Sequence, residues 1–275
     1  VHNFSFLNDP RNSFFVILGL MILIVGTLSV TYIYVEKFTS IIYFSRSLDN
    51  NISTIESLSK SDRILRNAIA LDKNDIYYRT LSQVYISQMS LLLNEKTTST
   101  DLLKSNLQAL VSSAEGSALL AVNQNTKQYL NYLNLGNVYA SFVPMSVEGS
   151  YEKAIDAYNK ASTLAPNNPS IFLLKASLEL ANKNNTEAKN FIKQALSLKN
   201  NYIDAIFFLA QVEKSEGNIS EAMKQVEYAG EISPNDATVF FRIGTFRYDN
   251  SDYSGAVSAF RSEERRVGKE CRSRW

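Results

Sequence analysis

Residues 151–166 read YEKAIDAYNKASTLAP, and small residues of this stretch return along the chain with a fixed 34-residue period. The period holds for three sets of positions: Ala154, Ala188, Ala222 and Ala256; Ala176, Ala210 and Gly244; and Phe172, Ile206 and Phe240. A globular domain with a single hydrophobic core does not require such a period. A period of about 20–50 residues is typical of stacked supersecondary units, and this one fits a helix–turn–helix repeat.

The second half of each unit has a signature of its own. Ala154, Tyr158, Ala161 and Pro166 recur as Ala188, Ile192, Ala195 and Asn200, and then as Ala222, Val226, Ala229 and Pro234. Spacings of three and four residues place side chains on one face of a helix, and the closing Pro or Asn ends that helix. The pattern therefore predicts an all-α array of helix pairs.

Several runs in this array resemble the tetratricopeptide repeat. They are Leu135-Gly136-Asn137-Val138-Tyr139, Tyr151-Glu152-Lys153-Ala154, Tyr158-Asn159-Lys160-Ala161 and Leu164-Ala165-Pro166, with Gly217, Ala222, Ala229 and Pro234 further on. The resemblance covers about half of the chain. It implies a right-handed α-solenoid of antiparallel helix pairs, in which small residues let neighbouring helices approach closely.

Two departures from the family pattern stand out. The interval from Gly136 to Ala154 is longer by six positions than the matching interval of later units, so extra residues around Val143-Pro144-Met145 lengthen the first turn. Glu179 and Glu213 stand where the family usually has an aromatic residue, and we expect weaker packing at both.

A second feature precedes the array. Residues 14–35 read FFVILGLMILIVGTLSVTYIYV, a stretch that contains no charged residue. At the helical rise it extends about 33 Å, enough to cross a hydrocarbon core of about 30 Å. Tyr32 and Tyr34 fit an interfacial aromatic belt. A signal peptide would have a shorter apolar core, and a buried soluble helix would not be apolar on every face, so we predict a transmembrane helix that contacts the lipid bilayer.

The orientation of this helix stays open. Arg11 precedes the span, whereas Lys37 and Arg46 follow it, which favours a cytoplasmic array by a single residue. The layout of a span followed by repeats is similar to that of certain bacterial O-antigen ligase or polymerase-like proteins, whose repeats would face outward. On that resemblance we place the protein in the bacterial inner membrane with an extracytoplasmic array.

The chain divides into six segments. These are a juxtamembrane segment at 1–13, the span at 14–35, a connector at 36–59, degenerate repeat-like helices at 60–128, the array at 129–260 and a tail at 261–275. Repeats of the array cover about 129–168, 169–202, 203–236 and an incomplete 237–260. In the degenerate region we expect helices at 62–71, 75–93 and 101–122, the last with Leu102 among its inward residues.

Both ends of the sequence differ from what a complete natural protein would show. Val1 is not an initiator Met, so we expect the sequence to begin inside a longer protein. Residues 261–275 break the repeat pattern and resemble a translated sequencing adapter, the alternative being a natural basic tail that binds anionic partners. Without this tail the net charge changes from +1 to −2, and the single Cys, Cys271, and single Trp, Trp275, are lost.

The remaining composition offers little chemistry. No disulfide, thiol nucleophile or zinc site is expected without cysteine, and a near-neutral charge gives no case for nucleic acid. The one histidine, His2, has no partner ligands, and no phosphate-binding loop or nucleophile motif is present. The acidic residues Glu115, Asp249 and Asp252, and the glycosylation tripeptides at Asn184 and Asn218, fit helix caps and turns. We predict no cofactor, no metal and no catalytic residue.

The array does offer a binding surface. In tetratricopeptide proteins the first helix of each unit lines a concave groove that holds an extended peptide or a partner helix. Matched positions place an apolar row beside a hydrogen-bonding row, which suits a peptide with apolar side chains. The rows are Leu133, Leu173, Phe207 and Phe241, and Asn137, Ser177, Gln211 and Thr245. The alternative is that Leu133 and Leu173 simply pack within the superhelix.

Two functions from different classes follow. In the first, the protein is a membrane-tethered scaffold whose repeats recruit a protein or peptide partner, with no catalysis in this fragment. In the second, it is the C-terminal part of a multi-pass cell-envelope glycan enzyme, similar to an O-antigen ligase or polymerase, with an appended repeat module.

Overall fold

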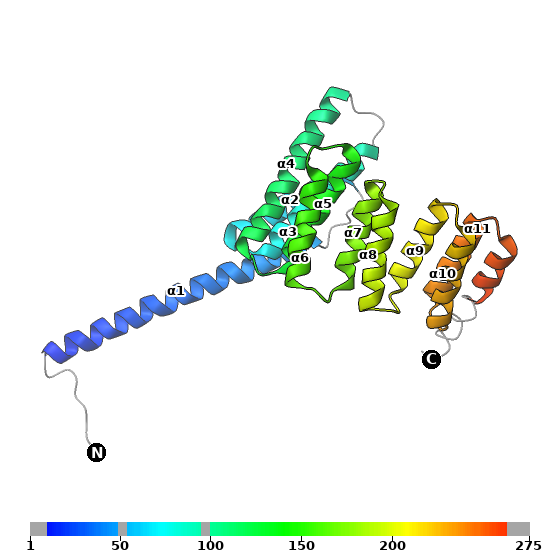
Figure 1. The fold of residues 1–275 in the computed structure, drawn as a ribbon. Coiled ribbons are helices and arrows are strands. Elements are labelled where there is room, and N and C mark those ends of the chain that lie inside the picture. The colour runs from blue at the N-terminus through cyan, green and yellow to red at the C-terminus, as the bar shows by residue number, and fades with distance from the viewer. Residues whose placement is uncertain (1–9, 49–53, 95–99, 263–275) are drawn as a thin grey trace, which may run out of the picture. The chain divides into compact units, whose positions relative to one another are not determined.

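The computed structural model describes residues 10–48, 54–94 and 100–262, which form helices with no strand among them (Figure 1). They belong to two compact units, residues 1–126 and 127–275. The first unit contains α1 (Pro10–Leu48), α2 (Ile55–Leu71), α3 (Asp75–Asn94) and α4 (Thr100–Gln124). The second contains α5 (Tyr129–Phe142), the 3-10 helix η1 (Val143–Met145), α6 (Ser150–Leu164), α7 (Pro169–Ala181), α8 (Asn185–Leu198), α9 (Ile203–Ser215), α10 (Ile219–Ile232), α11 (Ala237–Asp249) and a last helix at 253–262. The predicted all-α fold is confirmed.

α1 is a single helix of 39 residues that begins at Pro10. Proline suits a first helical turn because the N–H that it lacks would have no partner there. The large apolar residues from Phe14 to Val35 are exposed. Within the described residues, α1 alone is long and apolar enough to cross a membrane. It does not end at Val35, however, but continues to Leu48, through much of the segment that we expected to be a connector.

The C-terminal part of α1 is helical because it is packed. The hydroxyls of Ser40 and Tyr77 are hydrogen-bonded at 2.9 Å, and the rings of Phe44 and Tyr77 lie 4.7 Å apart. The Ser61 hydroxyl donates to the carbonyl oxygen of Ser47 over 3.1 Å. A segment with one buried face keeps a regular backbone, since its peptide groups must then be satisfied internally. The apolar helix is therefore continuous with the packed helices of the first unit.

The helices α2 and α4 each bury residues at the same spacing as the second helices of the array. The residues at these positions are no more than 1% exposed: Ser61, Leu65 and Ala68 in α2, and Ala114, Ala118 and Ala121 in α4. The intervals of four and three residues match those of Ala154, Tyr158 and Ala161. The expectation that Leu102 faces inward was wrong, because this residue is 55% exposed and the small residues further along α4 make the contact instead.

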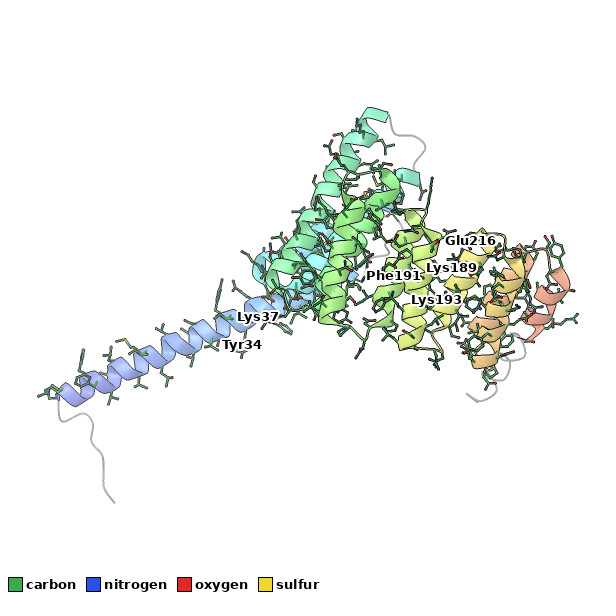
Figure 2. All side chains as sticks on the ribbon, viewed as in Figure 1. Tyr34, Lys37, Lys189, Phe191, Lys193 and Glu216 are labelled. Atoms are coloured by element: carbon green, nitrogen blue, oxygen red, sulfur yellow. The ribbon has the colours of Figure 1, made fainter. Side chains whose placement is uncertain are left out.

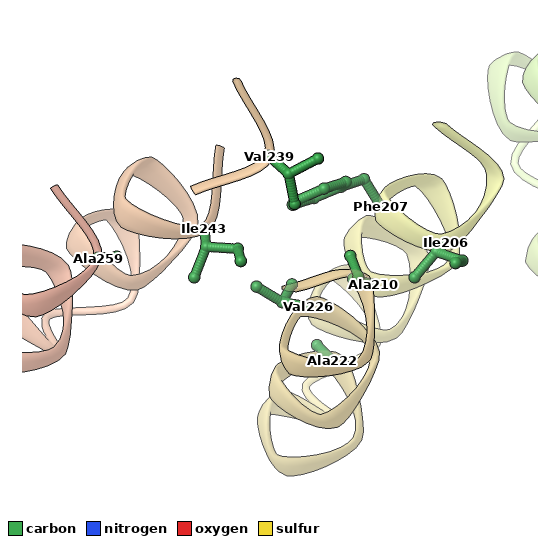
Figure 3. Close-up of a cluster of buried hydrophobic side chains, with 9 residues drawn as sticks. Ile206, Phe207, Ala210, Ala222, Val226, Val239, Ile243 and Ala259 are labelled. Atoms are coloured by element: carbon green, nitrogen blue, oxygen red, sulfur yellow. The ribbon is translucent and has the colours of Figure 1, made fainter. Parts of the chain in front are cut away.

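In the second unit, the residues that keep the 34-residue period form the core. Ala154, Ala188, Ala222 and Ala256 are all buried, as are Ala176 and Ala210. One cluster joins α9, α10 and α11 through Ile206, Val226, Val239 and Ile243, with small residues between them (Figure 3). The prediction that small residues let the helices approach closely is thereby confirmed.

At two positions of this unit an aromatic ring lies so close to the backbone that only glycine fits. A Cβ built at Gly136 would overlap the ring of Tyr158, and one built at Gly244 would overlap the ring of Phe260. In the two repeats between them the matching pairs are Ala176 with Ile192 and Ala210 with Val226. Thus a glycine faces each aromatic ring and an alanine faces each aliphatic side chain, which keeps the packed volume of every pair similar.

The turn of the first helix pair contains the predicted extra residues, and the turns of later pairs do not. In the first pair, η1 and two residues with positive φ, Ser146 at 58° and Gly149 at 71°, take up the extra length. The later turns are short, and each has one left-handed residue, at Lys183, Gly217 and Ser251. The lengthened first turn is confirmed.

Glu179 and Glu213 both form hydrogen bonds, and the weaker packing that we expected at these positions stays a prediction. Glu179 is 2% exposed and accepts hydrogen bonds from the Tyr151 hydroxyl at 2.7 Å and the Asn184 amide at 3.1 Å. Glu213 accepts a matching hydrogen bond of 2.9 Å from the amide of Asn218. Each carboxylate therefore ties the end of one helix to the start of its partner, and the contact of Glu179 is buried whereas that of Glu213 is partly exposed.

Glu213 also links two repeats. The Lys189 ammonium on α8 lies 2.7 Å from its carboxylate and also pairs with Glu216, which Figure 2 labels with Lys189. The side chains of Lys189 and Glu213 are 20% and 13% exposed. The hydrogen bonds from Lys189 and then Asn218 lower the pKa of the Glu213 carboxyl below its ordinary value of 4.5.

This pKa shift predicts acid sensitivity. Since the folded pKa of Glu213 is lowered, its stabilisation is fully present above about pH 4.5 and is lost as the pH falls through the folded pKa. We expect Glu213→Gln to reduce the unfolding free energy at pH 7 by about 0.2–1 kcal/mol. The difference from wild type should shrink as the pH falls, in denaturant titrations at several pH values. Glu152→Gln, at an exposed site on α6, is the control, and equal effects of the two substitutions would contradict the prediction.

Candidate peptide-binding groove

A cleft of about 420 Å³ lies across three first helices of the second unit, α7, α9 and α11. Its apolar lining comes from Leu173 and Leu174 on α7 and from Phe207 and Phe208 on α9. Its polar lining consists of Ser170, Ser177, Tyr202, Asp204, Gln211 and Arg242. Because these helices are related by the 34-residue period, equivalent positions meet in the cleft from successive repeats. The repeat itself therefore builds the cleft.

An arginine lines the cleft from α11. The Arg242 guanidinium lies 3.9 Å from the centre of the Phe207 ring and donates a 2.8 Å hydrogen bond to Asp204. Phe207 is only 7% exposed beneath it and forms part of the floor. Stacking on an aromatic face and pairing with a carboxylate both hold a guanidinium in one orientation. The opposite charges of Asp204 and Arg242 offset each other in the lining.

Hydroxyl groups also line the cleft. Ser170 and Tyr202 share a hydrogen bond of 3.2 Å between their hydroxyls, which ties α7 to the start of α9. Ser177 and Gln211 are exposed along the side of the cleft. Their hydroxyl and amide groups can donate and accept, as a peptide backbone requires. In the described parts of the chain, no group of three or more His, Cys, Asp or Glu could hold a metal ion.

Comparisons with known proteins agree with this architecture. The profile of the tetratricopeptide repeat family matches residues 148–168 and 169–202. The chain carries tetratricopeptide repeats. The solved tetratricopeptide protein TTC0263 of Thermus thermophilus is 16% identical over 75% of this chain and 98% of its own, with a TM-score of 0.54. Pseudomonas aeruginosa pilF is 16% identical over 83% of this chain and 89% of its own, with a TM-score of 0.50. No curated protein matches the chain.

Four of the eight groove residues predicted from the tetratricopeptide pattern line this one cleft: Leu173, Ser177, Phe207 and Gln211. The other four lie outside it. On α5, Leu133 is half-buried, and the side-chain oxygen of Asn137 accepts a 2.8 Å hydrogen bond from the Tyr158 hydroxyl. On α11, Phe241 is 55% exposed with its ring 5.8 Å from that of Phe260, and Thr245 donates its hydroxyl hydrogen to the backbone oxygen of Phe241.

Sequence reasoning missed the pair Asp204 and Arg242. Arg242 follows Asp204 by one 34-residue period plus one further helical turn. Residues at that offset face each other across neighbouring first helices. Opposite charges at this separation were the signal that could have found them.

Proposed function

We propose that this protein is a membrane-tethered scaffold that recruits a partner protein by holding an extended segment of it in the tetratricopeptide groove. The observation that carries the proposal is the cleft across α7, α9 and α11, with its apolar floor and hydrogen-bonding sides. Tetratricopeptide arrays act as binding scaffolds through such concave surfaces. We assign no catalytic step to this chain.

The lining indicates which segment fits best. An apolar side chain can occupy the space between Leu174 and Phe208, and the backbone on either side of it can bond to Ser177 and Gln211. Asp204 and Arg242 neutralise each other, so the cleft has no net charge to attract a strongly acidic or basic peptide. An extended segment with apolar side chains at alternate positions therefore matches the groove better than a charged one.

The groove can be tested with a displayed library of random peptides selected on the wild-type chain. Ser177→Arg places a long charged side chain in the cleft from an exposed position, so it should weaken the selected peptides at least tenfold without affecting the fold. Ser197→Arg is the matched control, because Ser197 is an exposed serine on α8 of the same repeat, outside the cleft. Equal binding of the selected peptides to wild type and Ser177→Arg would contradict the groove.

The tether rests on α1. Its apolar residues from Phe14 to Val35 are exposed, and a stretch of this length matches a bilayer core of about 30 Å. We expect the chain to resist extraction from membranes by alkaline carbonate. A Leu20→Arg and Ile24→Arg double variant should be released, since each arginine at the bilayer centre opposes insertion by about 2.5–3.5 kcal/mol. Release of the wild-type chain by carbonate would contradict the tether.

A further inference from the structure

An apolar stripe on α1 continues beyond the segment that a membrane can cover. Phe38, Ile41 and Leu48 are 66%, 55% and 57% exposed, and Ser45 between them is exposed as well. Ser40 and Ser47 are buried on another face, against α2 and α3. The contacts of this part of α1 thus leave a second, apolar face exposed among the described residues of the first unit.

Lipid does not account for this face. If Phe14–Val35 crosses the bilayer, Leu48 lies about 20 Å above the span along the helix. The headgroup layer on each side is only about 5–8 Å thick. Phe38 can lie within that layer, but Ile41 and Leu48 extend beyond it into water. Scattered apolar residues are common on surfaces, whereas aligned ones indicate an interaction surface.

The spacing of the stripe identifies a helix as the covering element. Tyr34, Phe38, Ile41, Ser45 and Leu48 follow one another at intervals of four, three, four and three residues. This is the alternation of the two core positions of a heptad, whose mean period of about 3.5 residues keeps the same seam against a partner helix. Tyr34 stands out from α1 in Figure 2 and is 70% exposed.

The same seam continues into the span. Going back by three and then four residues from Tyr34 leads to Thr31 and Thr27. Their hydroxyls donate to backbone oxygens of their own helix, Thr31 to Thr27 at 2.8 Å and Thr27 to Ile24 at 2.9 Å. Threonine is one of the small residues that let transmembrane helices approach closely. The stripe therefore runs without a break from the membrane interior to Leu48, and it contains no charge.

We propose that this stripe, defined as Thr27, Thr31, Tyr34, Phe38, Ile41, Ser45 and Leu48, is a parallel dimer interface with the stripe of a second copy of this chain. A second copy has an identical span, so the bilayer holds its stripe at the same height and in the same direction. A twofold axis along the seam pairs each residue with its own counterpart. Without charge on the stripe, this pairing brings no like charges together. The proposal rests on the membrane tether of the proposed function.

Disulfide cross-linking of the full chain in membranes tests the interface. The single native cysteine is first replaced by Cys271→Ser, and Ile41→Cys, Ser45→Cys or Leu48→Cys is then introduced separately. Oxidation by copper phenanthroline should convert each stripe variant to a covalent dimer. Arg46→Cys is the matched control, because Arg46 is exposed next to Ser45 but lies off the stripe, and its dimer yield should be at least fivefold lower.

Further measurements separate the possible failures. Adding Ile41→Asp and Leu48→Asp to the Ser45→Cys variant should reduce its dimer yield at least fivefold, and both sites are exposed, so the fold should tolerate the change. Equal yields at Ser45 and Arg46, no dimer from membrane-retained protein, or cross-links only to a different protein would each overturn the second copy as occupant. Release of the chain by carbonate would instead overturn the tether, and the inference with it.

Discussion

Replacing Gly136 by alanine should lower the unfolding free energy of the repeat array by about 1–3 kcal/mol. Gly136 is buried in α5, and its added Cβ would overlap the ring of Tyr158 on α6. Tyr158 is 1% exposed, and its hydroxyl is fixed by a 2.8 Å hydrogen bond to Asn137, so the ring has little room to move. Guanidinium unfolding of the full chain, followed by circular dichroism, would measure the loss.

A second substitution should recover part of that loss. Gly136→Ala with Tyr158→Ile reproduces the Ala176 and Ile192 pair of the next repeat. We expect the double variant to be more stable than the sum of the two single effects by at least about 0.5 kcal/mol. Gly116→Ala in α4 is the control: its Cβ would meet no atom within 4 Å, so it should stabilise the chain by about 0.5–1 kcal/mol. Simple additivity of Gly136→Ala and Tyr158→Ile would show that volume matching does not govern this pair.

The same pairs explain why the sequence predicts the fold so well. A solenoid reuses one packing solution, so each small residue recurs at the same place, and the period reports burial directly. Ala188, Ile192 and Ala195 illustrate this, because all three were placed on one face by spacing alone and all three are fully buried. The tetratricopeptide resemblance adds the pairing of the helices, which periodicity by itself does not specify.

What the sequence did not predict depends on contacts between elements. Residues 36–48 were assigned to a connector, although their apolar and aromatic character also allowed the span to continue as a helix, and the burial of Ser40 and Ser47 by α2 and α3 was not foreseen. Glu179 was expected to weaken packing because it stands where the tetratricopeptide pattern usually has an aromatic residue, and its hydrogen bond from Tyr151 was not foreseen. Tyr77 lies 37 residues from Ser40 and Tyr151 lies 28 residues from Glu179, so no local pattern carries these two contacts.

The groove residues and the two termini of the chain are predictable from the sequence to different degrees. The family pattern selects the helix face of the groove residues, and four of them line one cleft, but their role in binding stays a prediction. Arg242 was not foreseen because its partners, Asp204 and Phe207, lie on another helix. The interpretation of residues 261–275 as foreign stays a prediction as well, since 263–275 lie outside the described residues. His2 also lies outside them.

Replacing Lys175 by leucine should stabilise the array by about 1–2 kcal/mol, as expected when a buried charge gives way to a packed apolar side chain. Lys175 is 6% exposed on α7, and its ammonium lies 5.4 and 5.5 Å from the ring centres of Phe172 and Phe191. The two rings attract the charge but replace its water only in part. Leu209 and Ile243 hold the same position in the next two repeats, so the repeat accepts an apolar side chain at this position.

The dependence of this gain on pH separates the buried charge from a simple packing effect. Burial lowers the pKa of Lys175 below its ordinary value of 10.5, so in the window between the folded and unfolded pKa the unfolded chain binds more protons. The destabilisation by Lys175 is then complete below the folded pKa and is relieved as the pH rises towards 10.5. Lys175→Leu should therefore gain most at pH 7 and less at pH 10 in denaturant titrations. Lys199→Leu, at an exposed lysine 5.3 Å from the Tyr202 ring, should change stability by less than about 0.5 kcal/mol at either pH. If Lys175→Leu raised the unfolding free energy equally at both pH values, the effect would come from packing alone, because only the titration of Lys175 makes the difference depend on pH.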